Sequence, residues 1–134
     1  MSTPTAEAEI AEFEAQKAIV VKRFDRRWLA DGSLMRLPQE GFCQALSVAS
    51  TRKYQPDGGP GIVQIIELLK CSDVLEQDIA TFMCANIIFW LLGATDRHAK
   101  NFSIFRNPTG FQLTPLYDVL SSQPSLNAGQ IQSK

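Results

Sequence analysis

Two carboxylates and one carboxamide in the last third of the chain have the types and spacing that phosphoryl transfer requires. Asp96 and Asn101 stand five positions apart in a polar stretch, and Asp118 follows after a further 17 residues. A D-x-x-x-x-N spacing is typical of the catalytic loop of protein kinases. In that chemistry one carboxylate accepts the proton of an acceptor hydroxyl. An amide oxygen and a second carboxylate bind Mg²⁺, a hard cation that prefers oxygen ligands.

The same three residues also have an ordinary structural interpretation, because Asp and Asn are common turn and cap residues. The spacing alone favours that structural interpretation. The order of a long apolar helix, a polar loop, a short hairpin and a second carboxylate shifts the balance toward phosphoryl transfer without securing it. Both interpretations remain open on these residues alone.

The elements that must position these residues can be predicted from the hydrophobic pattern. Residues 74–92 are expected to form the longest helix, at the centre of the core, because apolar residues cover most of its circumference toward its end. Strands are expected at 102–105 and 111–113, so that a hairpin brings Asp118 back beside Asn101. The main apolar stripe of the long helix is expected to comprise Ile79, Phe82, Met83, Ile87, Trp90 and Leu91.

The upstream part of the chain predicts shorter elements. Residues 5–18 are expected to form an acidic, alanine-rich helix, and the glycine-rich loop 57–61 is interpreted as a tight turn that fixes the next helix. The remaining predicted elements are a strand at 18–21, a hairpin strand at 33–37 after the Asp31-Gly32 turn, and helices at 39–48 and 62–69.

Composition limits the class of protein. The chain has 134 residues, 45% of them apolar and 20% charged, with a formal charge of −1. These values predict one ordinary globular domain and exclude a disordered, collagen-like or disulfide-stapled chain. Three widely spaced cysteines predict reduced thiols. The acidic N-terminus is no signal peptide, and the longest apolar run, 87–94, is far shorter than the roughly 20 residues of a membrane span. A cytoplasmic protein without membrane contact is expected.

Five stretches of the chain resemble the HipA family, bacterial serine/threonine kinases that serve as toxins of toxin–antitoxin modules. They are RFDRRW at 23–28, RLPQE at 36–40, YQPDGGPG at 54–61, GATDRHAKNFSIF at 93–105 and LTPLYDVLS at 113–121. The resemblance covers about 20–124 in family order, and TDRHAKN is its most specific part. It implies an α+β, mainly helical fold, a partial kinase-like C-lobe with a hinge strand and a catalytic-loop β-hairpin, and the use of ATP and Mg²⁺.

The resemblance also implies a role for individual residues. Asp96 matches the family's catalytic aspartate, and Asn101 and Asp118 match its Mg²⁺ ligands. Arg26 and Arg27 are interpreted instead as parts of a solvated turn. The residues that match nucleotide-binding positions are Lys22, Arg23 and Phe24 in the hinge, Gln39 at the pocket edge, His98 and Lys100 in the catalytic loop, and Tyr117 beside the second metal ligand. The family often has Glu at the position of Lys22, so main-chain groups are expected to hold the adenine.

A kinase also needs a phosphate-covering loop and a strand lysine upstream of the hinge. Only about 20 residues precede Lys22 in this sequence, and no glycine precedes Gly32. We therefore expect the central part of a HipA-like kinase, as a truncated product, half of a split system or a cut piece. The expected units are an acidic helix or tail at 1–17, the C-lobe fragment at 18–124 and a flexible tail at 125–134.

Two functions follow from the resemblance. The first is a kinase segment that transfers the ATP γ-phosphoryl group to a protein serine or threonine. The second is a catalytically inactive remnant that binds an antitoxin or another partner. Loss of the phosphate-clamping lobe removes positioning and charge stabilisation, so we expect weak nucleotide binding and negligible transfer by the chain alone. The implied partners are a protein substrate, a HipB-like helix-turn-helix antitoxin through which DNA is contacted only indirectly, and a separate N-lobe chain.

Overall fold

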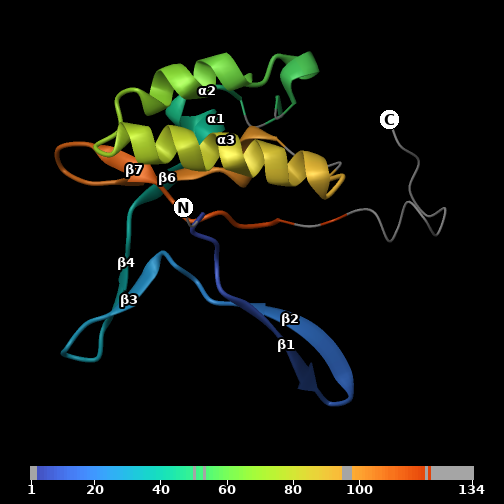
Figure 1. The fold of residues 1–134 in the computed structure, drawn as a ribbon. Coiled ribbons are helices and arrows are strands. Elements are labelled where there is room, and N and C mark those ends of the chain that lie inside the picture. The colour runs from blue at the N-terminus through green and yellow to red at the C-terminus, as the bar shows by residue number, and fades with distance from the viewer. Residues whose placement is uncertain (1–2, 50, 53, 95–97, 120, 122–134) are drawn as a thin grey trace.

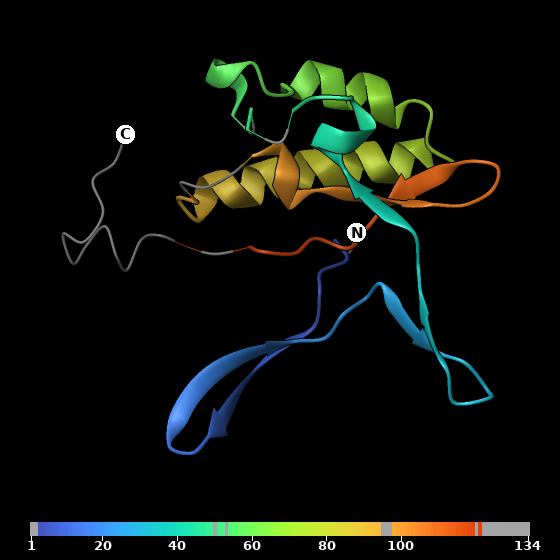
Figure 2. The ribbon, with the colours of Figure 1, turned by 180° about the vertical axis from the view of Figure 1, so that it is seen from behind.

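The computed structural model describes residues 3–49, 51–52, 54–94, 98–119 and 121. The helices lie together with a short sheet in one body, and two β-hairpins project from one side of it (Figure 1). The view from behind shows the same separation of body and hairpins (Figure 2). Helices and strands make up similar shares of the described chain. The α+β class therefore holds, whereas the expectation of a mainly helical fold is not confirmed.

The N-terminal element is a hairpin, and the helix expected at 5–18 is wrong. β1 (Ala8–Phe13) pairs in antiparallel fashion with β2 (Gln16–Val21). Glu14 and Ala15 between them have φ values of 48° and 64°. Positive φ at both central residues gives the two-residue turn whose twist matches that of the flanking strands. The β-branched end of β2 favours an extended chain, and its pairing with β1 outweighs the helix propensity of the alanines and glutamates.

The second hairpin lies where the Asp31-Gly32 signal predicts it. β3 (Arg26–Trp28) pairs in antiparallel fashion with β4 (Leu34–Arg36). Gly32 has a φ of 82°, and the Asp31 carboxylate accepts hydrogen bonds from the Ser33 amide (2.9 Å) and hydroxyl (2.6 Å). The turn is therefore fixed by local side-chain bonding and by the conformational freedom of glycine.

A three-stranded antiparallel sheet in the order β5-β6-β7 forms the floor of the body. β5 (Gln39–Gly41) pairs with β6 (Ser103–Arg106), which continues through a turn into β7 (Phe111–Leu113). The hairpin predicted from strands at 102–105 and 111–113 is thus confirmed. The helix expected at 39–48 is largely wrong, because its first residues pair with β6 and only α1 (Phe42–Ala45) remains helical.

Two longer helices agree with the sequence prediction. α2 (Ile62–Leu69) matches the expected bounds, and α3 (Leu75–Leu91) begins and ends within one residue of them. None of the described helices is long and apolar enough to cross a bilayer. The predicted position of α3 at the centre of the core is wrong, because α3 packs against α2 and β7 through one face only. That face comprises Asp78, Thr81, Phe82, Ala85 and Phe89, whereas Met83, Ile87, Trp90 and Leu91 are exposed.

An aromatic cluster around Phe102 forms the centre of the core. The Phe42 ring stacks on Phe102 with a centroid separation of 5.7 Å. Phe82 and Phe89 meet the same ring edge-on at 5.1 and 5.7 Å. Edge-to-face and offset aromatic pairs contribute stability beyond their buried area. Since Phe102 directly follows the polar loop with the candidate residues, the core fixes the end of that loop.

A buried carboxylate joins the start of α3 to the sheet. The Asp78 Oδ2 atom accepts hydrogen bonds from the Ser72 hydroxyl (2.5 Å) and the Leu113 amide (2.8 Å). Asp78 and Ser72 are both buried. Hydrogen bonds to a charged acceptor are among the stronger ones, so this contact holds β7 against α3.

Candidate functional site

The polar loop ends in a single 3₁₀ turn, η2 (Ala99–Asn101), immediately before Phe102. The Asn101 amide donates a hydrogen bond to the His98 carbonyl at 3.0 Å. Asn101 is buried, whereas Lys100 is exposed, so the turn places the carboxamide inward and the ammonium group in solvent. The predicted catalytic residue Asp96 lies outside the described residues.

The hydroxyl group of Tyr117 links this turn to the segment that carries Asp118. It donates a hydrogen bond to the Lys100 carbonyl at 2.9 Å and shares a second one with the Ser103 hydroxyl. Residues 100 and 103 lie on either side of Asn101 in the chain, so the Tyr117 hydroxyl binds the chain both before and after the predicted metal ligand. Asp118 comes next in the chain and is exposed, with a φ of 56°. The structure therefore ties the Asp118 segment to the Asn101 turn, as the hairpin predicts.

The phenol of Tyr117 stays protonated at neutral pH. Burial raises its pKa above the ordinary value of 10.0, and the nearby Asp118 charge acts in the same direction, against the hydrogen bond with Ser103. A neutral hydroxyl keeps its proton for donation to a carbonyl. The bond to Lys100 is thus available over the whole physiological pH range.

Residues near the N-terminus hold the same segment from the other side. Thr5 forms a parallel bridge with Leu116. The Ala6 amide donates to the Leu116 carbonyl at 2.7 Å, and the Leu116 amide donates to the Pro4 carbonyl at 2.9 Å. These main-chain contacts fix the residue before Tyr117. Because any residue type can make them, the sequence carries no signal for this clamp.

Phe24 brings the predicted hinge to the site. Its ring lies 5.8 Å from the ring of Tyr117 and meets Phe105 edge-on at the same separation. Gln39 stands opposite Phe105 in the register of β5 and β6. The Oε1 atom of Gln39 is buried and has no hydrogen-bond partner among the described residues. Phe24, Gln39 and Tyr117 therefore belong to one neighbourhood, as the sequence predicts.

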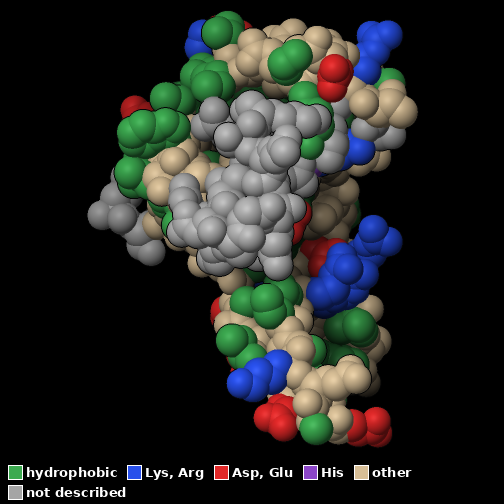
Figure 3. Space-filling view, turned by 90° about the vertical axis from the view of Figure 1, so that its right-hand side faces the viewer, with side chains coloured by type: hydrophobic (Ala, Val, Ile, Leu, Met, Phe, Trp, Pro, Cys, Tyr) green, Lys and Arg blue, Asp and Glu red, His purple; other side chains and the backbone are tan. Residues whose placement is uncertain are grey.

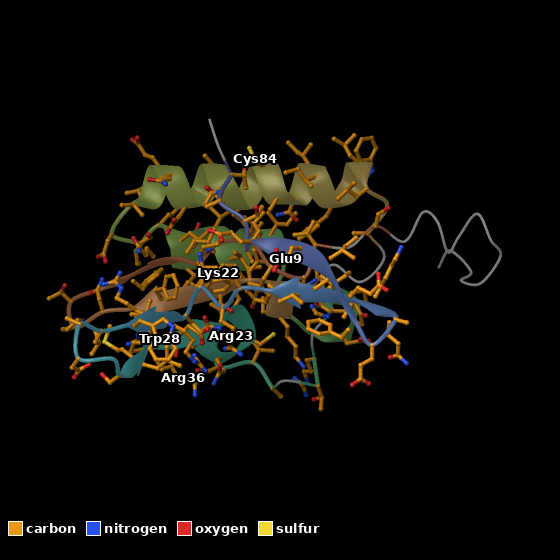
Figure 4. All side chains as sticks on the ribbon, turned by 90° about the horizontal axis from the view of Figure 1, so that it is seen from below. Glu9, Lys22, Arg23, Trp28, Arg36 and Cys84 are labelled. Carbon is orange, nitrogen blue, oxygen red and sulfur yellow. The ribbon has the colours of Figure 1, made fainter. Side chains whose placement is uncertain are left out.

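The side chains of Lys22 and Arg23 have other contacts. Lys22 donates from its ammonium group to the Glu7 carboxylate at 2.9 Å and from its amide to the Glu7 carbonyl at 2.9 Å, which closes the base of the β1–β2 hairpin. Arg23 binds Asp25. Figure 4 shows Lys22 and Arg23 among the side chains of the hairpin side of the molecule. The structure does not direct either side chain to Tyr117.

Asp25 is a buried carboxylate that the sequence reasoning missed. Arg23 donates to it from Nε and Nη2, both at 2.7 Å, and Arg26 forms a further ion pair with it. The hydrogen bond from Arg23 lowers the pKa of Asp25 to about 2, against the opposing effect of burial. Arg26 and Arg27 both lie in strand β3, so the solvated-turn interpretation is wrong; Arg26 is half-buried, and only Arg27 is exposed to solvent. The sequence RFDRR places one aspartate among three arginines, and this pattern could have indicated the ion pairs of Asp25.

His98 lies on a small cavity of about 220 Å³. Its ring meets Tyr54 edge-on at 5.4 Å. The glycine-rich loop lines part of the same cavity. It forms the predicted turn: Gly58 has a φ of 84°, and Gly61 directly precedes α2. Apolar side chains of α2, α3 and the core line the cavity, among them Ile65, Phe82, Phe89 and Phe102.

The donor set at the end of the sheet suits magnesium better than zinc. No group of three or more His, Cys, Asp or Glu side chains that could hold a metal occurs within the described residues. Mg²⁺ needs no such group, because it commonly binds one or two protein oxygen ligands together with waters and substrate phosphates. The carboxamide of Asn101 and the carboxylate of Asp118 are ligands of this kind, and the tie through Tyr117 is consistent with their acting together.

Comparison with solved structures defines the class of fold. The chain resembles the HipA chain in a complex of Shewanella oneidensis HipA with HipB and operator DNA, with a TM-score of 0.73 and 28% identity. The match covers 90% of this chain and 31% of that one. The family model for the HipA-like C-terminal domain matches residues 1–133. The chain therefore belongs to this family.

Curated relatives agree with this assignment. The chain is 42% identical over 105 residues to Y4mE of Sinorhizobium fredii, covering 78% of this chain and 25% of that protein. It is 32% identical over 131 residues to the serine/threonine-protein kinase toxin HipA of Shewanella oneidensis, covering 87% of this chain and 30% of the relative. The chain thus spans between a quarter and a third of the length of the curated relatives it matches.

Proposed function

We propose that this chain is the part of a HipA-type serine/threonine kinase that binds Mg²⁺ and the nucleotide. The whole kinase transfers the γ-phosphoryl group of ATP to a protein hydroxyl within a toxin–antitoxin module. The observation that carries the proposal is the Tyr117 hydroxyl, which binds the Lys100 carbonyl and Ser103 and so ties Asp118 to the Asn101 turn. Membership in the HipA-like family and the kinase among the curated relatives support the same class.

Each residue near the loop has a distinct part in this proposal. Asp96 accepts the proton of the acceptor hydroxyl, which requires only an ionised carboxylate within hydrogen-bonding reach. Asn101 and Asp118 hold Mg²⁺ through oxygen atoms. When bound, the metal neutralises charge on the phosphates. His98 and Lys100 contribute a ring and an ammonium group on the phosphate side.

The adenine side of the site is assigned to the hinge backbone. Among the described residues, no main-chain hydrogen bond uses the amide or carbonyl of Arg23 or Phe24, whereas the Lys22 amide is already bound to Glu7. Open donors and acceptors in an extended segment suit the edge of a planar base. The buried Oε1 atom of Gln39 offers one more acceptor, and Tyr117 and Phe24 form an aromatic wall.

Partners of the proposed kinase follow from its relatives. A HipB-like antitoxin is proposed because the structural neighbour is a complex with HipB and operator DNA, and DNA contact is proposed only through that antitoxin. A protein substrate and a cytoplasmic location complete the proposal. The alternative function, a partner-binding module without catalysis, is favoured by one observation. Ile87, Trp90 and Leu91 expose apolar side chains along one side of α3.

A nucleotide-binding experiment separates these two functions. A non-hydrolysable ATP analogue is titrated into the chain by calorimetry, with and without Mg²⁺. The kinase segment predicts weak binding that strengthens with Mg²⁺ and loses this dependence in Asn101→Ala and Asp118→Asn. Asp31→Asn, in the exposed turn of the second hairpin, is the matched control and keeps the dependence. Absence of binding at millimolar nucleotide, or equal metal dependence in all variants, contradicts the proposal. The partner-binding module without catalysis is then the remaining function.

Phosphoryl transfer itself provides a further check. The chain alone is expected to show negligible ³²P transfer from ATP to protein, because positioning and charge stabilisation supply most of the catalysis in this reaction. Transfer by the chain alone that disappears in Asp96→Asn would overturn that expectation. Transfer that arises only after addition of a folded chain carrying the phosphate-covering loop and strand lysine supports the kinase assignment. Persistent inactivity of this mixture, with both chains folded, contradicts it.

A further inference from the structure

We propose that Asp25 is a positioning residue, whose carboxylate and carbonyl hold the hinge in the shape that presents Phe24 and the adjoining main chain to the nucleotide. The inference rests on the proposed function and adds to it a residue that does not itself touch the nucleotide. It starts from the contacts of Asp25, which join the hinge to β3 and to the segment just after β4.

The carboxylate of Asp25 fixes the segment on both sides of itself. Arg23 forms a bidentate pair with it, at 2.7 Å from both Nε and Nη2, and Arg26 binds the same carboxylate at the start of β3. The side chain of Asp25 is only 3% exposed, whereas that of Arg23 is 60% exposed. A bidentate guanidinium–carboxylate pair restricts geometry as well as adding energy. Positions 23 to 26 are thereby locked around a single buried anion.

The carbonyl of Asp25 connects the hinge to the segment between β4 and β5. It accepts a hydrogen bond from the Leu37 amide at 2.9 Å, just after β4. Leu37 stands two residues before Gln39, the first residue of β5. Asp25 therefore joins the hinge to the second hairpin, at the point where the chain leaves β4 and leads to Gln39.

Phe24 transmits this constraint to the site. It lies between Arg23 and Asp25 in the chain, and its ring contacts Phe105 and Tyr117. Its backbone has no main-chain hydrogen bond among the described residues, so the neighbouring anchor determines where its amide and carbonyl point. In the space-filling view, basic and acidic side chains meet at the level where the hairpins join the body (Figure 3). An anchor next to Phe24 in the chain controls the hinge without occupying the nucleotide pocket.

The test compares two isosteric substitutions of buried carboxylates. In Asp25→Asn the side-chain NH₂ group replaces one acceptor oxygen. It then faces the N–H donors of the guanidinium groups, so the bidentate pair cannot form. Asp78→Asn is the matched control, because Asp78 is equally buried but joins α3 to β7 instead of the hinge. For both variants and the wild type, thermal unfolding, the Kd of an Mg²⁺–ATP analogue and amide hydrogen exchange at Leu37 are measured under one set of conditions.

The proposal predicts a split between the variants. Asp25→Asn weakens nucleotide binding by about tenfold, the size expected for loss of a charge-assisted hydrogen bond, and accelerates exchange of the Leu37 amide. Asp78→Asn lowers the unfolding temperature but leaves both quantities unchanged below the transition. Unchanged nucleotide affinity in Asp25→Asn, or an equal loss in Asp78→Asn, overturns the positioning role.

Failure of the proposed function gives a different result. If the wild type binds no nucleotide at millimolar concentration, the nucleotide-binding assignment fails, while Leu37 exchange still decides whether Asp25 orders the hinge. Faster exchange in Asp25→Asn alone supports the ordering. Unchanged exchange in Asp25→Asn, in a chain that stays folded, overturns it.

Discussion

Replacement of Tyr117 by phenylalanine tests the contact on which the site depends. The change removes one oxygen atom and with it the hydrogen bonds to the Lys100 carbonyl and the Ser103 hydroxyl. The ring remains, so the contact with Phe24 persists and no large cavity forms. The perturbation is therefore confined to the link between the Asp118 segment and the Asn101 turn.

The expected cost follows from the burial of Ser103. Ser103 is 3% exposed, so water cannot readily replace the lost hydroxyl. A net hydrogen bond contributes about 0.5–1.5 kcal/mol, and a buried polar group left without a partner costs about 1–3 kcal/mol. Tyr117→Phe should thus lower the free energy of unfolding by about 2 kcal/mol. Ser103→Ala removes only one of the two bonds and should cost less.

Two assays measure this effect. Urea unfolding of wild type, both single variants and the double variant gives the coupling energy between Tyr117 and Ser103, which should differ clearly from zero because the residues are in contact. Binding of Mn²⁺ as a probe of the magnesium site should weaken in Tyr117→Phe. If the unfolding free energy of Tyr117→Phe stays within about 0.5 kcal/mol of wild type, as for an ordinary surface substitution, the inferred link does not hold Asp118 in place.

Three further predictions concern stability. Because the pKa of Asp25 is lowered in the folded chain, its ionised carboxylate stabilises the fold fully above the pKa of the unfolded chain, near 4, and this stabilisation is lost as the pH falls toward 2. Acid-unfolding curves should show this loss in the wild type and not in Asp25→Ala. Gly110→Ala places a Cβ atom 2.0 Å from the Asp73 carboxylate, which Asn107 holds, so thermal unfolding should show a loss of about 1–3 kcal/mol, and Asp73→Ala in the same chain should recover part of it. Phe102→Ala removes the centre of the aromatic cluster and should cost about 3–5 kcal/mol in urea unfolding, whereas Phe13→Ala, on an exposed strand, should change little.

Elements with a clear period were predictable from the sequence. α2 and α3 follow from apolar residues at helical spacing, and the β6–β7 hairpin follows from strand alternation around turn residues. β4 follows from the Asp31-Gly32 turn signal, whereas its partner β3 lies in a charged stretch that was interpreted as a turn. The N-terminal hairpin was not predictable in this way. Its turn, Glu14-Ala15, has neither glycine nor asparagine, and its strands contain residues that favour helices in isolation. Pairing between the two strands, which the helix propensity of single residues does not report, determined the result.

The burial pattern of α3 illustrates a second limit. An apolar pattern around most of a helix predicts a central position, yet only the face with Phe82 and Phe89 packs inward, and Trp90 is exposed. A sequence pattern reports which side chains are apolar, but not which elements are available to cover them.

The residues of the candidate site stay a prediction from the sequence, whereas the contacts that connect them come from the structure. The spacing of Asp96, Asn101 and Asp118, together with the family resemblance, predicts phosphoryl transfer. The link through Tyr117 uses a main-chain carbonyl, and the clamp on Leu116 uses only main-chain groups, so neither leaves a sequence signature. The role of Asp25 was not predicted for another reason. A run of alternating charges is typical of a solvated turn, and only the structure shows that the Asp25 carboxylate is buried.

Paramagnetic NMR offers the most direct test of the central claim, that Asn101 and Asp118 form the metal side of a nucleotide site. Trace Mn²⁺ is added to the ¹⁵N-labelled chain together with a non-hydrolysable ATP analogue, and the broadening of each amide signal is recorded. The account predicts strongest broadening around Lys100, Asn101 and Asp118, weaker effects at Phe24, and loss of the pattern in Asn101→Ala. Broadening spread over the acidic N-terminal hairpin instead, or an unchanged pattern in Asn101→Ala, would contradict it.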